Sequence, residues 1–318
     1  MRAEATLAAP ADRPVVRGLP QRDRCQVMGI LNVTPDSFSD GGAFFPGHRI
    51  DHGRAIAKGI QLAAEGADIV DVGGESTRPG ARRVSAEEEL HRVIPVVRAL
   101  ARTGLTVSVD TMRVRVAAAA VDAGAAIVND VSGGLAGPAM AGIVAEAQVP
   151  YVLMHWRAHS SHMRDHARYE NVATEVATEL RGRLAALAEA GIDPSRVVLD
   201  PGLGFAKTAE HNWALLAELD ALHALGRPIL IGASRKSFLG QAIAACGDAP
   251  PPAARDAATA AVSAIAAAGA FCVRVHNVPS TVDAERVARC WRAARRPRPP
   301  GVSQADRAHY PEAGPRWP

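Results

Sequence analysis

The sequence predicts an α/β protein in which eight parallel strands close into a single (β/α)8 TIM barrel, with a disordered extension at each end. Short apolar runs alternate with Ala-, Leu- and Glu-rich stretches of helical length, as in parallel strands joined by helical crossovers. Glycines after three of these stretches mark helix ends, at Gly66, Gly124 and Gly191. The predicted strands cover 27–31, 68–72, 106–109, 126–128, 151–154, 197–199, 229–231 and 272–275.

Helices are predicted between these strands, and their number matches the number of strands. A barrel of this kind usually takes about 250 residues, which fits 25–292. A doubly wound open sheet is the alternative, but no GxGxxG follows the first apolar run. We therefore expect a disordered extension over 1–24, the barrel over 25–292 and a basic, Pro-rich tail over 293–318. The predicted helices cover 49–65, 85–102, 113–123, 138–147, 171–190, 209–225, 253–268 and 280–292.

The composition is that of an ordinary globular protein. Hydrophobic residues make up 48% of the 318 residues and charged residues 22%. The net charge of +3 is too small to indicate a nucleic-acid partner. No run of roughly 18 apolar residues indicates a membrane span, and the first residues lack the apolar core of a secretory signal. The four cysteines form no CxxC pair, so we expect a cytoplasmic protein without a zinc site or disulfide framework.

Only three lysines occur among the 36 basic residues: Lys58, Lys207 and Lys236. A lysine that is retained in an arginine-rich chain is informative, because it provides a compact point charge. We interpret Lys58 as part of a solvated helix face and Lys207 as a surface cation. Lys236 is the lysine that we place in a site.

Polar side chains stand at the C-terminal ends of the predicted strands, where active sites of TIM barrels lie. Any one of them is explained equally well as a helix cap. Because nearly every strand ends in this way, we interpret the set as a site. These residues are Asn32, Asp71 with Glu75, Asp110, Asn129, His155, Asp200, Ser234 with Lys236, and Arg274 with His276.

The acidic and amide members favour a ligand edge rich in N–H donors. Asp110, Asn129 and Asp200 provide acceptors, as an aminopyrimidine requires. No metal-binding histidine stands beside them. Nothing in the sequence marks one of the carboxylates as specially desolvated.

The basic members favour an anion. Arg274 and His276 are two residues apart and point the same way. With 234–236 (Ser-Arg-Lys) they predict a cationic corner after the last two strands, where barrels commonly bind phosphate. A buried structural Arg274 paired with a carboxylate is the alternative.

Two Gly-containing loops, 71–80 and 200–207, add candidate binding residues. Phe205 offers a flat apolar wall, and Arg78 has a solvated loop charge as its alternative. No GxSxG elbow or nucleophilic triad is present. The site therefore looks suited to position two substrates and to stabilise an anionic leaving group.

Seven segments together closely resemble the dihydropteroate synthase family of folate biosynthesis, in order and from about residue 26 to residue 292. MHWRAHS (154–160) is most similar to the actinobacterial form. The segments are VMGILNVTPDSFSDGG (27–42), DIVDVGGESTRPGA (68–81), SVDT (108–111), IVNDVSGG (127–134), LDPGLGFAKT (199–208), ILIGASRKSFLG (229–240) and RVHNV (274–278).

The resemblance implies condensation of 6-hydroxymethyl-7,8-dihydropterin pyrophosphate with 4-aminobenzoate, giving 7,8-dihydropteroate and pyrophosphate, in a sulfonamide-sensitive, Mg²⁺-dependent homodimer. It implies that Asn32 bears on Mg²⁺. The catalytic set it implies is Asp36, Phe38, Lys236, Arg274 and His276. The implied pterin site is Asp110, Asn129, Met154, Asp200 and Lys236, and the pyrophosphate site is Asn32, Arg274 and His276. The implied 4-aminobenzoate site is Thr77, Arg78, Pro79, Phe205, Ser234 and Lys236.

The resemblance also implies that the first two loops close over the site, bringing in Asp36 and Phe38. Asn277 stands where the family usually has Asp, but it alternates away from Arg274. The stretch 156–170, with His159, His162 and His166, we interpret as a solvated loop. Three other functions remain open: a corrinoid-dependent pterin methyltransferase, a catalytically silent paralogue with a binding role, and a Schiff-base aldolase using Lys236.

Overall fold

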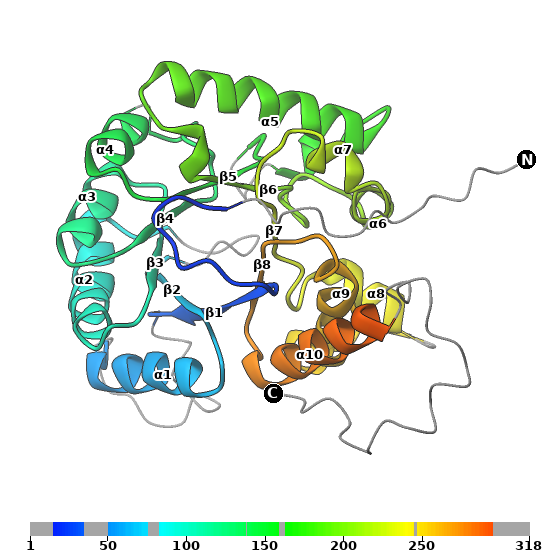
Figure 1. Cartoon of the computed structure of the whole chain (residues 1–318), viewed down its shortest axis with the longest axis horizontal. Coiled ribbons are helices and arrows are strands. Elements are labelled where there is room, and N and C mark those ends of the chain that lie inside the picture. The colour runs from blue at the N-terminus through cyan, green and yellow to red at the C-terminus, as the bar shows by residue number, and fades with distance from the viewer. Residues whose placement is uncertain are drawn as a thin grey trace, which may run out of the picture.

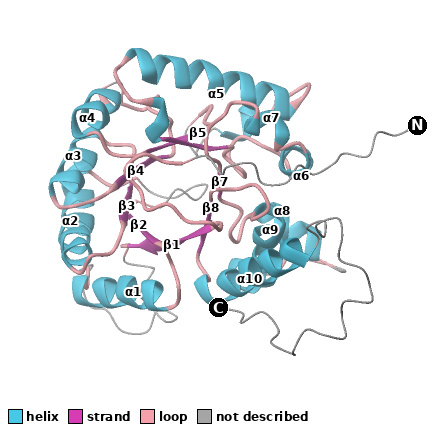
Figure 2. Ribbon diagram, viewed as in Figure 1, coloured by secondary structure: helices cyan, strands magenta, loops and turns pink. Residues whose placement is uncertain are grey.

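Eight parallel strands form one curled sheet in the order β6-β5-β4-β3-β2-β1-β8-β7, surrounded by helices (Figures 1 and 2). The computed structural model describes residues 15–34, 50–75, 83–137, 139–158, 163–244 and 247–294. A bridge between Leu199 and Ile229 joins the two end strands, so the predicted barrel is confirmed. The strands are β1 (Gln26–Asn32), β2 (Ile69–Gly73), β3 (Val107–Asp110), β4 (Ile127–Asp130), β5 (Tyr151–Met154), β6 (Val197–Asp200), β7 (Leu230–Ile231) and β8 (Cys272–Val275).

The helices follow the predicted alternation with two differences. The predicted helix 209–225 is two helices, separated at Glu218, where ψ has turned to 34°. A seven-residue helix after β7 was not predicted, because it is too short to show a periodic pattern and contains Gly240. The helices are α1 (His52–Ala64), α2 (Ala86–Arg102), α3 (Val114–Asp122), α4 (Met140–Ala147), α5 (Val172–Glu189), α6 (Ala209–Ala217), α7 (Asp220–His223), α8 (Ser237–Ile243), α9 (Asp256–Ala266) and α10 (Val278–Ala294).

Side-chain caps fix where several helices begin. Asp51, Ser85 and Asn171 each accept a hydrogen bond from a backbone N–H in the first turn of α1, α2 and α5. Thr208 forms a reciprocal capping box with His211 at the start of α6. The end of the loop after β6 is thereby held in place.

Two hydrophobic clusters stabilise the barrel. The larger lies between the strands and the surrounding helices. The smaller fills the lower part of the barrel interior with one residue from each of seven strands, together with Val16 from the N-terminal segment. The strand residues are Met28, Ile69, Ile127, Val152, Val198, Leu230 and Cys272.

The predicted disordered extension over 1–24 is wrong for residues 15–24. Val16 is only 2% exposed and closes the lower end of the interior cluster. The N–H of Arg17 donates to the carbonyl of Ser195 over 2.9 Å. Figure 1 shows this dark-blue segment running across the barrel before it enters β1. An apolar pair in a polar stretch was too short a pattern to reveal this role.

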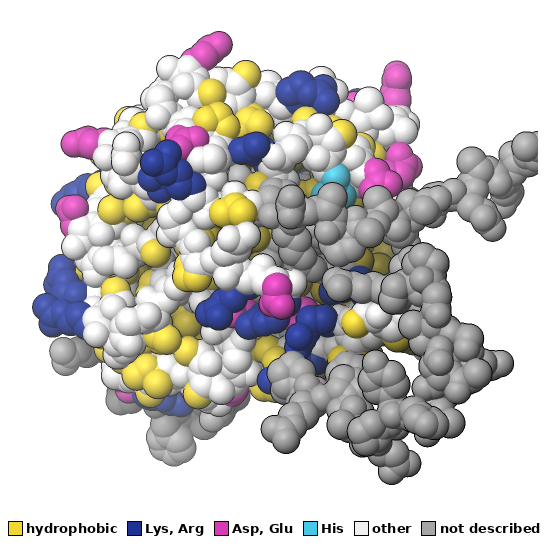
Figure 3. All heavy atoms as spheres, in the orientation of Figure 1, with side chains coloured by type: hydrophobic (Ala, Val, Ile, Leu, Met, Phe, Trp, Pro, Cys, Tyr) yellow, Lys and Arg dark blue, Asp and Glu magenta, His cyan; other side chains and the backbone are white. Residues whose placement is uncertain are grey.

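The surface adds two observations. No helix among the described residues is long and apolar enough to cross a membrane. On the face drawn in Figure 3, Lys and Arg side chains form several groups, and Asp and Glu side chains lie near some of them.

Candidate functional site

Strand alternation builds the site as the upper layer of the barrel interior. Side chains two residues apart on a strand face the same way, so the residue two positions beyond each interior apolar residue also points inward. Ile69, Ile127 and Val198 of the lower layer are followed in this way by Asp71, Asn129 and Asp200. By the same rule Val152, Leu230 and Cys272 are followed by Met154, Gly232 and Arg274.

The register of the strands brings the predicted tips side by side. Asn32 pairs with Gly73, Gly73 with Asp110, and Asp110 with Asn129. Met154 pairs with Asp200 on the other side of the barrel. A methyl group on Gly73 would lie 3.7 Å from Asp110 Oδ2 and 3.8 Å from Asn32 Oδ1, so a larger side chain would crowd both groups.

Arg274 bridges two carboxylates across the mouth of the barrel. Its Nε donates to Asp71 Oδ2 over 2.6 Å, and a terminal nitrogen donates to Asp110 Oδ2 over 2.6 Å. Burial lowers the pKa of Arg274, but the two carboxylates outweigh burial and raise it. The alternative of a carboxylate-paired Arg274 therefore describes the ligand-free protein.

Asp71 is the fixed anion at the centre of this arrangement. Its side chain is completely buried, and Oδ2 also accepts from Asn129 Nδ2 over 3.1 Å. Oδ1 has no hydrogen-bond partner among the described residues. The sequence marked Asp71 as one strand tip among several, whereas the structure shows that it orients both Arg274 and Asn129.

The structure shows two strongly desolvated carboxylates that nothing in the sequence marks. Burial raises the pKa of Asp110 to about 7, although Arg274 opposes the shift. Burial also raises the pKa of Asp200, against the attraction of Lys236. Sequence spacing cannot reveal this effect, because it depends on the depth at which each side chain lies.

Lys236 stands beside Asp200 and the loop after β6. Its Nζ donates to the carbonyl of Leu203 and lies 4.9 Å from the centre of the Phe205 ring. A methyl group on Gly232 would lie 3.7 Å from Asp200 Oδ2 and 3.9 Å from Lys236 Nζ, so this glycine leaves the two charges room. Burial lowers the pKa of Lys236 to about 8, while Asp200 opposes the shift.

The predicted cationic corner is only partly present. Ser234 Oγ lies 2.9 Å from His276 Nδ1 and accepts from the His276 backbone N–H over 3.1 Å. Arg235 is directed away, with φ at +58°, and forms a bidentate pair with Asp256 at 2.7 and 2.8 Å. Arg235 is thus a support for the loop rather than a site cation.

Glu75 and Asn277 also point into the scaffold. Glu75 pairs with Arg113 at 2.6 Å and with Arg83 at 3.1 Å. Asn277 donates to Asp256 Oδ2 over 3.0 Å and accepts from the N–H of Ser280 at the start of α10. The expectation that Asn277 alternates away from Arg274 agrees with these contacts.

Lys207 is not a surface cation, contrary to our interpretation. Its Nζ is hydrogen-bonded to His155 Nδ1 over 3.0 Å and to two carbonyls of its own loop over 3.1 Å each. His155 is 3% exposed and its Nε2 lies 2.9 Å from Glu179 Oε2. Lys207 and His155 therefore belong to a buried polar network behind the loop that carries Phe205.

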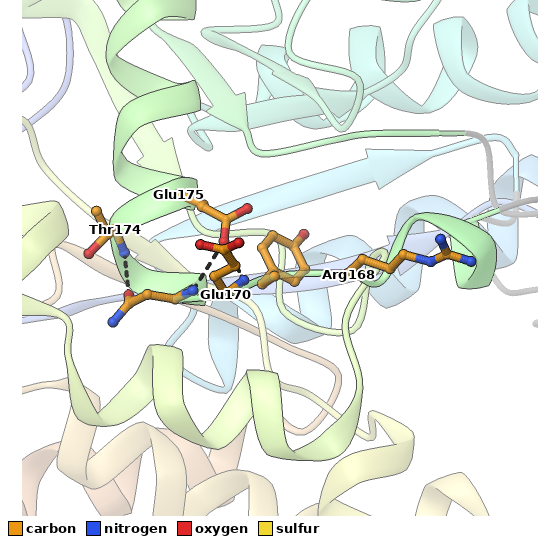
Figure 4. Close-up of a pocket in the computed structure, with 6 residues that line it drawn as sticks. Arg168, Glu170, Thr174 and Glu175 are labelled. Carbon is orange, nitrogen blue, oxygen red and sulfur yellow. Dashed lines mark hydrogen bonds between the residues drawn. The ribbon is translucent and has the colours of Figure 1, made fainter.

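Two cavities lie beside the strand-tip residues rather than over them. One of 590 Å³ is lined by Gly204, Lys207 and the first residues of α8, including Ser237, for which the sequence predicted no role. The other, of 570 Å³, lies at the start of α5. Figure 4 shows that Glu175 in the second cavity is directed at the backbone of 170–171, where its Oε1 accepts two N–H groups.

Some predicted site residues cannot be placed. Asp36 and Phe38 lie outside the described residues, as do Thr77, Arg78 and Pro79; His159 and His162 do too. Among the described residues, no group of three or more His, Cys, Asp or Glu side chains is arranged to hold a metal ion.

Comparison with known proteins identifies the family. Residues 28–276 match the model of the pterin binding enzymes. The chain is 54% identical over 269 residues to a dihydropteroate synthase of Mycobacterium leprae, covering 84% of this chain and 93% of the relative. It is also similar to the Xanthomonas albilineans dihydropteroate synthase solved with 4-aminobenzoic acid, at 44% identity and a TM-score of 0.77, over 87% of this chain and 95% of that one.

A third comparison agrees. The Yersinia pestis dihydropteroate synthase, solved as a sulfonamide drug complex, has a TM-score of 0.80 at 38% identity, covering 89% of this chain and 100% of that one. The barrel with its acidic upper layer, the matched family model and these relatives lead to one conclusion. The chain belongs to the pterin binding enzyme family, among the dihydropteroate synthases.

Proposed function

We propose that this chain condenses 6-hydroxymethyl-7,8-dihydropterin pyrophosphate with 4-aminobenzoate, releasing pyrophosphate and forming 7,8-dihydropteroate. The observation that carries the proposal is the upper layer of the barrel, where the acceptors Asp110, Asn129 and Asp200 lie with one cation, Arg274, which is paired with Asp110. The Xanthomonas relative binds 4-aminobenzoic acid, and the Yersinia relative binds a sulfonamide drug.

The pterin is held by hydrogen-bond acceptors. Asp110 and Asp200 accept from ring N–H and amino groups, because an aminopyrimidine edge presents donors to a carboxylate. Asn129 supplies an amide whose orientation is fixed by Asp71. Met154, 3% exposed in the same layer, packs against the ring face.

The pyrophosphate is held at the basic side of the barrel. Arg274 releases Asp110 and turns to the diphosphate, while its bond to Asp71 keeps the guanidinium in the mouth. This change of partner serves both the pterin ring and the diphosphate of the same substrate. Asp110 becomes free to bind the pterin as Arg274 binds the diphosphate. His276 and Asn32 complete the pyrophosphate site.

Mg²⁺ is proposed as the cofactor, with the Asn32 amide oxygen as its protein ligand. Asn32 stands at the end of β1, and Mg²⁺ prefers oxygen donors, keeps several waters and binds substrate phosphates. An amide oxygen is a donor of the type that Mg²⁺ prefers. A single protein ligand is sufficient, because the diphosphate and water supply the other oxygen ligands. When bound, the ion neutralises charge on the leaving pyrophosphate.

The bond changes need no strong base. The C–O bond breaks with its electron pair going to pyrophosphate, and carboxylates around the pterin stabilise the positive charge left on it. The neutral aromatic amine then forms the C–N bond and gives up a proton, for which the departing pyrophosphate is an acceptor. Arg274 and His276 stabilise the leaving group.

The 4-aminobenzoate site is placed between Phe205, Ser234 and Lys236. Lys236 lies over the Phe205 ring and attracts the substrate carboxylate. Thr77, Arg78 and Pro79 are proposed to complete this site, and Asp36 and Phe38 are proposed to close over it. We also propose a cytoplasmic homodimer, for which exposed Ile265 on α9 and Val287 on α10 offer an apolar contact surface.

Pyrophosphate release tests the proposal directly. The purified protein, given both substrates and Mg²⁺, is expected to release one pyrophosphate per 7,8-dihydropteroate formed, and chelation of Mg²⁺ is expected to stop release. A sulfonamide is expected to compete with 4-aminobenzoate. A folded sample that consumes neither substrate would rule out the synthase activity.

A further inference from the structure

The loop after β6, residues 201–208, has an unfavourable backbone conformation that must be held by other groups. Gly202, Gly204 and Ala206 all have positive φ, at 67°, 75° and 48°. For Ala206 this left-handed region is disfavoured, because its Cβ approaches the following carbonyl oxygen. A methyl group on Gly202 would lie 2.3 Å from the His155 carbonyl oxygen, so the loop is pressed against the residue after β5.

Lys207 holds this loop from behind. Its ammonium group donates to the carbonyls of Gly202 and Phe205 over 3.1 Å each and to His155 Nδ1 over 3.0 Å. An ammonium has three N–H donors, so these contacts use all of its hydrogen-bonding capacity. Two of the three accepting atoms lie in the loop itself, at the two ends of the turn that the Phe205 N–H closes on the Gly202 carbonyl.

The protonation states of His155 and Glu179 allow His155 to accept a hydrogen bond from Lys207. His155 Nε2 lies 2.9 Å from Glu179 Oε2, so Nε2 carries the hydrogen and Nδ1 is an acceptor for Lys207. Burial lowers the pKa of His155 to about 4, despite the hydrogen bond to Glu179, and the ring is neutral near pH 7. Arg157 in turn holds Glu179 and stacks 3.9 Å over the Tyr169 ring.

A second lysine holds the same loop from the site side. Lys236 donates to the carbonyl of Leu203, and a methyl group on Gly204 would lie 2.9 Å from Lys236 Cδ. The loop therefore lies between the two lysines. All three donors of Lys207 are engaged behind the loop, whereas Lys236 faces the proposed substrate.

We infer that Lys207 is a positioning residue that fixes Phe205 for binding of the aromatic amine substrate, acting through the backbone of the loop and not by touching substrate. The inference rests on the proposed function in naming that substrate. It predicts a defect mainly on the amine side of the reaction. Of the pterin acceptors, only Asp200 contacts the loop, through the N–H of Gly202 over 2.7 Å, whereas Asp110 and Asn129 lie on β3 and β4.

The main test replaces Lys207 by Met, which keeps the chain length and removes the donors. Lys207→Met is expected to raise the KM for 4-aminobenzoate about ten-fold or more, because misplacement of a positioning group is costly. The KM for the pterin pyrophosphate is expected to stay within about two-fold of the native value. Lys58→Met is the matched control, since Lys58 lies on α1 with its side chain 42% exposed. Equal rises in both KM values, or none, would overturn the inference.

A pair of His155 variants guards against a folding defect in Lys207→Met. His155→Asn retains an acceptor for Lys207 near the Nδ1 position, whereas His155→Gln retains a donor to Glu179 near the Nε2 position instead. Only His155→Gln is expected to reproduce the rise in KM for 4-aminobenzoate. The reverse order would show that Glu179, and not Lys207, is the partner that matters.

The pH dependence supplies a further readout. Burial lowers the pKa of Lys207 to about 7, with Asp200 opposing the shift and Lys236 and Arg157 adding to it. Above that pH the neutral amine has two N–H donors for three acceptors, so the native KM for 4-aminobenzoate is expected to rise. Lys236, with a pKa of about 8, titrates in both proteins, and the difference between the native and Lys207→Met profiles isolates Lys207. Parallel profiles would contradict the assignment.

Hydrogen exchange separates this inference from the proposed function. Amides of residues 202–207 are expected to exchange about ten-fold faster in Lys207→Met than in the native chain or Lys58→Met. This result does not depend on catalysis. Failure of the native protein to release pyrophosphate would remove the proposed reaction, whereas unchanged exchange would remove the role of Lys207.

Discussion

Asp110 and Lys236 both stand at the C-terminal ends of the strands, and their pKa values are displaced toward each other. Burial raises the pKa of the Asp110 carboxyl to about 7 and lowers that of the Lys236 ammonium to about 8. Each group therefore changes charge close to neutral pH. Asp110 accepts hydrogen bonds well only when it is ionised, and Lys236 attracts a carboxylate only when it is protonated.

A narrow bell-shaped pH profile is expected as a result. Turnover at low concentrations of both substrates should fall below about pH 7, as Asp110 gains a proton and binds the pterin less well. It should also fall above about pH 8, as Lys236 loses a proton and no longer attracts the 4-aminobenzoate carboxylate. Steady-state kinetics from roughly pH 5.5 to 9.5, a range that spans the pKa values of Asp110 and Lys236, would measure this profile. Asp110→Asn controls for titration of the substrate phosphates, whose own pKa is about 6. If the acid limb survives unchanged in Asp110→Asn, the assignment to Asp110 is wrong.

Arg274 has a stabilising role in addition to its proposed catalytic role. Arg274→Ala leaves Asp71 buried without its cation, which typically costs about 3–5 kcal/mol in the free energy of unfolding. Turnover is expected to fall at least about 100-fold, as for loss of a group that stabilises a developing anion. Urea unfolding and pyrophosphate release measure the two effects. Arg98→Ala, which removes an exposed arginine on α2, is the control, and native turnover in folded Arg274→Ala would argue against the role in leaving-group stabilisation.

At the scale of elements, the loop after β6 depends on glycine for two separate reasons. Gly202 has positive φ, and a methyl group there would also meet a backbone oxygen. Gly226 has a similar φ of 66°, but its methyl group would meet nothing within 4 Å. The two positions therefore separate conformational strain from steric contact.

Gly226→Ala is expected to lower the free energy of unfolding by about 1–2 kcal/mol, which is the strain of a left-handed residue that carries a Cβ. Gly202→Ala should cost at least about 2 kcal/mol more, since the His155 carbonyl cannot move without shifting the end of β5. Denaturant unfolding of both variants measures the difference. Equal losses of stability in the two variants would mean that the loop after β6 moves away from the His155 carbonyl at no cost in free energy.

Most elements could be predicted from the sequence because apolar runs and helical stretches alternate strictly. Tyr151–Met154 and Cys272–Val275 have the predicted bounds. The short α8 could not be predicted, because seven residues make too few turns to show a period. The strand-tip residues could also be predicted, since alternation along a strand fixes which side chains point inward.

Partners within the site could not be predicted. Arg274 was expected beside His276 and Arg235, yet it pairs with Asp71 and Asp110 from distant parts of the chain. Lys207 looked like a surface cation because nothing in its local sequence reveals that His155 lies next to it. Such contacts depend on distances across the barrel, which the sequence pattern does not contain.

At the scale of the whole molecule, the apolar side chains on α9 and α10 are the clearest candidate for a contact between copies. Ile265 is 78% exposed and Val287 is 63% exposed. The helices α9 and α10 lie side by side on the outside of the barrel in Figures 1 and 2. A symmetric dimer that covers this surface would bury both residues.

Sedimentation equilibrium is expected to show a dimer for the native chain. Ile265→Glu together with Val287→Glu should shift the equilibrium to monomer, because two charges would be buried at the contact. Ile60→Glu on α1 is the matched control, since Ile60 is 46% exposed and lies elsewhere. A dimer that persists in the double variant would place the interface on another surface.

The burial of Val16 at the lower end of the barrel interior also bears on the order in which the parts of the chain fold. The cluster that buries Val16 takes its last member, Cys272, from β8, near the end of the described chain. The first described segment can therefore reach its final environment only after the last strand has joined the barrel. Protection of the backbone around Val16 from proteolysis would accordingly report completion of folding. The residues around Val16 would be among the last to find their place, although they are synthesised before every strand of the barrel.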